Sequence, residues 1–144
     1  MKHRIKRLLG IVASLGLAIQ FLPVSRTNPP VTGDIPAPPE IKTLLRNACY
    51  DCHSHETVWP WYSRFAPSSW LIANDVKSGR GKMNLSAWAD NKPAKQGVLL
   101  DDAIGQIQQG EMPPFYYVWM HPAARLTEAE KECLTSWMKS VPRE

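Results

Sequence analysis

Cysteine and histidine are scarce in this chain, with three and four copies among 144 residues. So few cysteines exclude a small scaffold held together by many disulfides. Segments that alternate apolar and polar residues are also lacking, which argues against a sheet. Neither a Ser/His/Asp set nor a carboxylate pair at a recognisable spacing occurs, so we expect the protein not to be an enzyme.

A broad excess of one charge sign is missing as well. The net charge is +4, but Lys2, Arg4, Lys6 and Arg7 all precede the first acidic residue. The other 13 basic residues equal the 13 acidic residues in number. The high isoelectric point is therefore a property of the N-terminus, and we expect no nucleic acid among the partners.

One long hydrophobic run is present, from Leu8 to Leu22, directly after the basic cluster. As a helix it would be about 22 Å long, somewhat short for a bilayer but suited to a signal peptide. We expect residues 1–23 to be a signal peptide or a signal anchor, with a retained membrane anchor preferred. The folded part is then expected on the periplasmic side of the cytoplasmic membrane, either anchored there or secreted to the periplasm.

Proline is abundant, with 13 copies, and residues 24–39 are rich in it. Such a stretch is typical of a stiff, extended spacer. We therefore predict three segments: the signal or anchor at residues 1–23, the spacer at 24–39, and a folded domain at 40–144.

Four helices are predicted in that domain from apolar spacing and end signals. The first starts at Glu40 behind Pro39, the second near Pro67, and the third near Pro93. The fourth starts at a capping box made by Thr127 and Glu130, and it should bury Cys133 as a small apolar residue. The predicted fold class is all-α.

The motif that carries chemistry is CxxCH, formed by Cys49, Cys52 and His53. It is the pattern by which a chain attaches haem through two thioether bonds while the histidine binds the iron. On a helix the three side chains project from one face. The sequence thus predicts one covalent haem c, with Tyr50 and Asp51 pointing elsewhere and only tolerated.

A second axial ligand is expected for an electron-transfer haem, and Met112 is preferred. It follows a helix end in the sequence GEMPP, where prolines can hold an irregular loop in place. His121 is the rival and would give a haem of lower potential. His55 lies too close to His53 to reach the other face of the ring, and Met120 is expected to pack inside the fold.

Several motifs together resemble the exported haem-binding domain family of the cytochrome c superfamily. They are CYDCHS at residues 49–54, WPWYS at 59–63, PSSWL at 67–71, GEMPP at 110–114, and HP followed by a final LTEAE helix. The resemblance implies a cytochrome c-like helical domain around a covalent haem, with His53 and Met112 as iron ligands. It also implies that Trp59, Trp61 and Tyr62 line the haem or bind its propionates.

Three functions are compatible with these features. The first is a monohaem electron-transfer cytochrome at the outer face of the cytoplasmic membrane, serving unidentified redox partner proteins. The second is a haem-based redox or gas sensor, or an accessory haem domain, in which the distal ligand detaches. The third uses Cys49 and Cys52 as a dithiol or zinc site, but the βαβ context of thioredoxin-like motifs is missing.

Overall fold

The computed structural model describes residues 2–143, which form helices joined by loops. No strand occurs among them, and one isolated β-bridge joins Gly33 to Ala87. The chain divides into two compact units. The first comprises Met1–Thr27 and Trp59–Asp75, and the second comprises Asn28–Val58 and Val76–Glu144. Helix α4 (Ser68–Lys82) begins in the first unit and ends in the second.

The first unit contains helix α1 (Lys2–Ala18) and the 3-10 helices η1 (Ile19–Phe21) and η2 (Trp61–Arg64). No residue of α1 is buried. The Gln20 side chain bonds both backbone groups of Ala66, donating to its carbonyl at 3.2 Å and accepting from its N–H at 2.9 Å. Paired side-chain and backbone bonds of this kind hold a loop without needing a core.

The prediction of an N-terminal membrane segment is wrong. No helix in residues 2–143 is both long enough and apolar enough to cross a membrane. Residues 2–18 instead form a regular helix whose first turns carry the basic cluster. The apolar part that remains is shorter than a bilayer's hydrocarbon core requires. The three predicted segments, 1–23, 24–39 and 40–144, stay a prediction.

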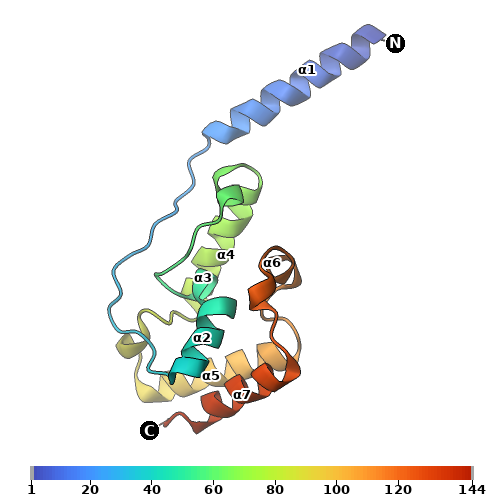
Figure 1. The fold of residues 1–144 in the computed structure, drawn as a ribbon. Coiled ribbons are helices and arrows are strands. Elements are labelled where there is room, and N and C mark those ends of the chain that lie inside the picture. Colours follow the sequence, from blue (N-terminus) through green and yellow to red (C-terminus); the bar gives the residue numbers. More distant parts are fainter. Residues whose placement is uncertain (1, 144) are drawn as a thin grey trace. The chain divides into compact units, whose positions relative to one another are not determined.

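The second unit is built on three longer helices, α2 (Pro39–Ala48), α5 (Pro93–Gln108) and α7 (Glu128–Ser140). Helices α5 and α7 lie side by side, and α2 packs against α7 (Figure 1). The short helices α3 (Tyr50–His53) and α6 (Phe115–Met120) and the 3-10 helices η3 (Trp88–Asp90) and η4 (Pro122–Ala124) connect them.

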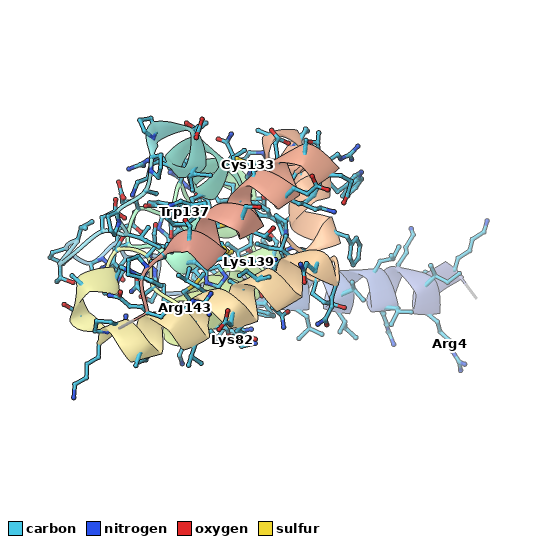
Figure 2. The ribbon with its side chains drawn as sticks, turned by 90° about the horizontal axis from the view of Figure 1, so that it is seen from below. Arg4, Lys82, Cys133, Trp137, Lys139 and Arg143 are labelled. Atoms are coloured by element: carbon cyan, nitrogen blue, oxygen red, sulfur yellow. The ribbon has the colours of Figure 1, made fainter. Side chains whose placement is uncertain are left out.

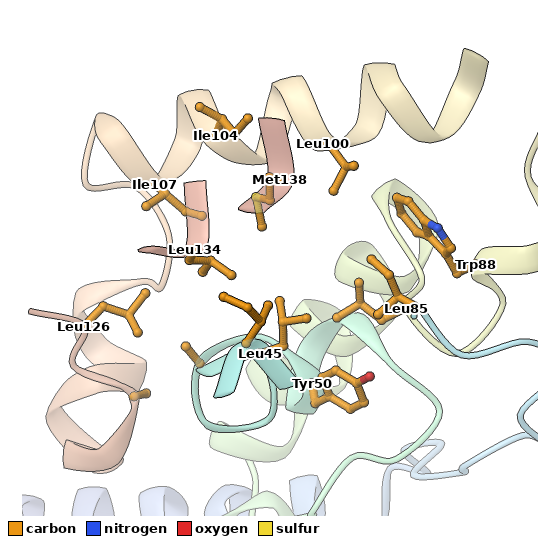
Figure 3. Close-up of a cluster of buried hydrophobic side chains, with 14 residues drawn as sticks. Leu45, Tyr50, Leu85, Trp88, Leu100, Ile104, Ile107, Leu126, Leu134 and Met138 are labelled. Atoms are coloured by element: carbon orange, nitrogen blue, oxygen red, sulfur yellow. The ribbon is translucent and has the colours of Figure 1, made fainter. Parts of the chain in front are cut away.

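The core of this unit lies where the three longer helices meet. Figure 3 shows Leu45 of α2 close to Leu134 and Met138 of α7, and all three side chains are almost fully buried. Leu100, Ile104 and Ile107 add the inner face of α5. Burying a side chain of this size stabilises the fold by about 1.5–3 kcal/mol. This packing fixes the orientation of α2, and with it the position of residues 49–53, which follow directly after α2.

The helix starts agree closely with the sequence signals. Pro39 and Pro93 stand in the first turns of α2 and α5. At α7 both bonds of the capping box are present, because Thr127 accepts from the Glu130 N–H and the Glu130 carboxylate accepts from the Thr127 N–H. The expectation of a buried Cys133 is wrong: this residue lies on α7 with its side chain exposed (Figure 2).

Candidate functional site

A cavity in the second unit opens beside the CxxCH motif. Its volume is about 670 Å³ with the part open to solvent included. Cys49, His53 and Met112 all line it, together with Ala48, Lys82, Met83, Leu99, Asp102, Ala103, Gln106, Ile107, Pro113, Leu126 and Met138.

His53 is prepared to bind a metal through one defined nitrogen. Its Nδ1 lies 3.0 Å from the carbonyl oxygen of Met83. Because a carbonyl only accepts, Nδ1 carries the proton, and Nε2 keeps its lone pair for a ligand. Burial lowers the pKa of His53, although the carbonyls of Met83 and Gly79 oppose this. The ring is therefore neutral at pH 7, the form that binds metals.

Cys49 and Cys52 are one helical turn apart, and neither is in a disulfide. The N–H groups of Cys52 and His53 both donate to the Cys49 carbonyl, at 3.2 and 2.9 Å, which keeps the turn compact. Burial, and then the neighbouring Cys52, raise the pKa of the Cys49 thiol to about 12. Redox-active thiols have a lowered pKa, so this environment does not suit a dithiol site.

Tyr50, the residue after Cys49, anchors the motif to the start of the unit. Its hydroxyl donates to Asp34 Oδ1 at 2.6 Å, and Lys42 Nζ donates to Asp34 Oδ2 at 2.7 Å. Burial alone would raise the pKa of Asp34, but the hydrogen bonds from Lys42 and Tyr50 lower it overall. Tyr50 therefore points away from the cavity, as predicted, but it is held by a charged network rather than only tolerated.

Helix α4 approaches the motif closely at Gly79. A Cβ atom built on Gly79 would lie 2.5 Å from the carbonyl oxygen of Cys52 and 2.9 Å from its carbonyl carbon. Real Cβ atoms essentially never approach backbone so closely, so either α4 or the CxxCH turn would have to move. Glycine is required here because two backbones pass each other in contact.

Replacing Gly79 with alanine is therefore expected to destabilise the second unit. Overpacking at a rigid contact costs about 1–3 kcal/mol of unfolding free energy. Urea unfolding of the purified full chain measures this loss. Gly81→Ala is the matched control, because a Cβ there meets nothing within 4 Å and alanine favours a helix. Equal stability of the two variants would contradict the close contact.

Met112 is the candidate second ligand that the structure places at the cavity. Its backbone N–H donates to the Gln106 carbonyl at 3.2 Å, which ties it to the end of α5.

The other candidate ligands do not line the cavity. His121 is absent from the cavity lining, and its ring stacks on Tyr117 with centroids 4.3 Å apart. Met120 is 44% exposed, so the expectation that it packs inside is wrong. His55 bonds Pro30 and Asn84 through its two ring nitrogens.

The three aromatic residues implied by the resemblance belong to the first unit. The Trp61 ring contacts Tyr62 edge to face at 5.7 Å and is 71% exposed. Trp59, Trp61 and Tyr62 all lie within Trp59–Asp75. Their contact with haem stays a prediction.

Sequence reasoning missed the wall of the cavity formed by α5. Leu99, Ala103 and Gln106 recur at intervals of four and three residues and so share one helix face. Spacing alone marked Leu99 as an apolar position. Which apolar positions face a cavity and which fill the core depends on how α5 packs on α7, and no local pattern encodes that packing.

The second unit is thus a helical domain whose cavity is lined by one cysteine of the CxxCH motif, Cys49, and by a neutral histidine, His53. A family model described as "Haem-binding domain" matches residues 14–140. The match covers most of the chain, and the protein belongs to this haem-binding domain family. No curated protein and no solved structure matches the chain.

The residues of the cavity fit haem. Carbon side chains from α5 and α7, such as Leu99 and Met138, can contact a flat apolar ring, and His53 Nε2 is available to iron. Lys82 also lines the cavity and can neutralise a carboxylate of the ligand. The family, the cavity and the donor atoms therefore agree on a haem protein.

Proposed function

We propose that this protein is a monohaem c-type cytochrome of the cytochrome c superfamily that transfers single electrons. The observation that carries the proposal is that one apolar cavity is lined by Cys49, His53 and Met112 together. In this proposal Cys49 and Cys52 attach the haem covalently, and His53 and Met112 bind the iron. The bound haem supplies a metal that accepts and releases one electron.

The chain's own residues define what that metal can do. The Met83 carbonyl orients His53 and makes its free nitrogen more basic. A methionine sulfur as second ligand favours ferrous iron and gives a higher potential than a second histidine. If His53 and Met112 both held the iron, the bound haem would have no open site for oxygen or peroxide. The proposal is therefore electron transfer between partner proteins and no catalysis.

The proposed location is outside the cytoplasmic membrane. A basic cluster followed by an apolar run is typical of export signals, and a covalent bond keeps haem on a protein where lost haem is not readily replaced. We thus propose that the protein is exported across the cytoplasmic membrane, and no membrane-spanning helix is part of the proposal.

Maturation of the full chain with haem-attachment machinery tests the proposal. We expect one haem per chain that stays with the polypeptide through acid-acetone extraction, with a pyridine haemochrome spectrum typical of two thioether bonds. A reversible one-electron titration should follow. Extraction of all pigment into the solvent would show that haem is not attached, and the proposal would then be wrong.

A further inference from the structure

The segment that carries Met112 is firmly held at its beginning. The Gln106 carbonyl accepts from the N–H groups of both Glu111 and Met112, at 3.0 and 3.2 Å. Two bonds on one carbonyl fix the backbone where it leaves α5. The position of the Met112 side chain then depends on how the chain continues after it, through Pro113 and Pro114 into α6.

Helix α6 has little of the packing that usually holds a helix in place. None of its six residues is buried, and Phe115 and Trp119 are 84% and 78% exposed. Tyr117 and Val118 are partly buried and contact the core. Because burial of apolar surface is the main source of stability, α6 needs another attachment to stay in one position.

That attachment is a hydrogen bond to the CxxCH motif itself. The Tyr117 hydroxyl donates to Asp51 Oδ2 at 2.8 Å, and Asp51 Oδ1 accepts from the Val58 N–H at 2.8 Å. Asp51 lies between the two cysteines, and both of its oxygens are used. The bond therefore joins the helix after Met112 to the turn that presents Cys49, Cys52 and His53.

The same tyrosine also holds the rival ligand. The Tyr117 and His121 rings are stacked, with centroids 4.3 Å apart and planes 14° apart. The His121 N–H donates to the Tyr117 carbonyl at 2.8 Å, which completes the end of α6. One residue thus positions the segment behind Met112 and keeps the His121 ring in a stack away from the cavity lining.

We propose that Tyr117 is a positioning residue that selects Met112 over His121 as the distal haem ligand. The inference rests on the proposed function, because it concerns the same haem site. The bond to Asp51 keeps α6 against the attachment turn, and the stack occupies one face of the His121 ring. Loss of both releases α6, so that methionine leaves more often and histidine can replace it.

Tyr117→Phe separates the bond from the stack. The phenylalanine ring keeps the stack but leaves Asp51 without its donor. We expect the rate of carbon monoxide binding to the ferrous matured protein to rise roughly tenfold, because one hydrogen bond to a carboxylate no longer opposes release of methionine. Ser140→Ala removes a hydroxyl oxygen from the exposed end of α7 and should leave the rate unchanged. A Tyr117→Phe rate equal to that of this control would overturn the inference.

A double-mutant cycle checks that the effect passes through Asp51. Asp51→Ala should raise the same rate, and adding Tyr117→Phe to it should raise the rate no further, because the bond is already lost. If the rate in the double variant equals the product of the two single effects, Tyr117 does not act through Asp51, and the inference fails.

Tyr117→Leu removes both the bond and the stack. We expect the sulfur-to-iron charge-transfer band of the oxidised protein to disappear while a low-spin spectrum remains, because His121 replaces Met112. Adding His121→Gln should then remove the histidine-ligated spectrum and restore part of the charge-transfer band, because Met112 is still present to bind the iron. Retention of the band in Tyr117→Leu, or the same spectrum with and without His121, would overturn the inference. If the unsubstituted protein itself lacks bound haem or the band, the proposed function fails instead.

Discussion

Replacing Cys49 and Cys52 together with alanine is expected to remove covalently attached haem completely, from one per chain to none. In the proposed attachment Cys49 and Cys52 are the two thioether donors, and Cys133 cannot replace them, because it lies exposed on α7 and does not line the cavity. Acid-acetone extraction followed by a pyridine haemochrome assay of the remaining polypeptide measures the loss. Haem still bound to the double variant would mean that the attachment assigned to these cysteines is wrong.

Cys133→Ala is the matched control, because it deletes the same atom from a surface position and should keep one haem per chain. Single substitutions at Cys49 or Cys52 should leave one thioether bond and shift the haemochrome maximum accordingly. The two singles differ in their surroundings. Cys49 lines the cavity, whereas the backbone of Cys52 is in contact with α4 at Gly79.

Replacing Met112 with alanine is the second large expected effect. The sulfur-to-iron charge-transfer band should disappear while covalent haem remains, and the reduction potential should fall. Carbon monoxide binding to the ferrous protein should accelerate by tenfold to a thousandfold in order of magnitude, because a methionine-free state of about 0.1–10% becomes the whole population. Visible and near-infrared spectra, a potentiometric titration and stopped-flow mixing measure these changes.

Met120→Ala is the control for the chemical change, since Met120 is a half-exposed methionine of α6. His121→Gln should also leave the band in place, because His121 stacks on Tyr117 outside the cavity lining. An intact band in Met112→Ala would move the ligand to another residue. Rapid carbon monoxide binding by the unsubstituted protein would instead favour a sensor over a protein that only transfers electrons.

Local signals in this sequence predicted the main helices well. Pro39, Pro93 and the capping box of Thr127 and Glu130 all mark helix starts in the structure. Such signals work because each satisfies, or does without, backbone N–H groups within a few residues. The short helix α6 was not predicted, since six residues of mostly exposed aromatic sequence carry no helical apolar face.

The N-terminus shows where a local pattern misleads. The apolar run from Leu8 to Leu22 predicts a membrane segment, but the helix there starts among the basic residues and ends at Ala18, followed by a 3-10 turn. A hydropathy run counts residues, whereas a membrane span needs one continuous helix of sufficient apolar length. Whether an apolar run can span a membrane therefore depends on where the helix that contains it begins and ends, and the length of the run alone does not decide it.

By itself, the sequence determined the CxxCH motif, because the positions of Cys49, Cys52 and His53 within five consecutive residues define their geometry in any helix. Only the tertiary structure decided which distant groups meet this motif: Met112 at the cavity, Met83 at His53 Nδ1, Asp34 at Tyr50, and Tyr117 at Asp51. The physical reason is the separation along the sequence over which each kind of contact acts. Helix spacing acts over one turn, whereas these contacts join residues that are brought together only when α2, α5 and α7 bury their shared core.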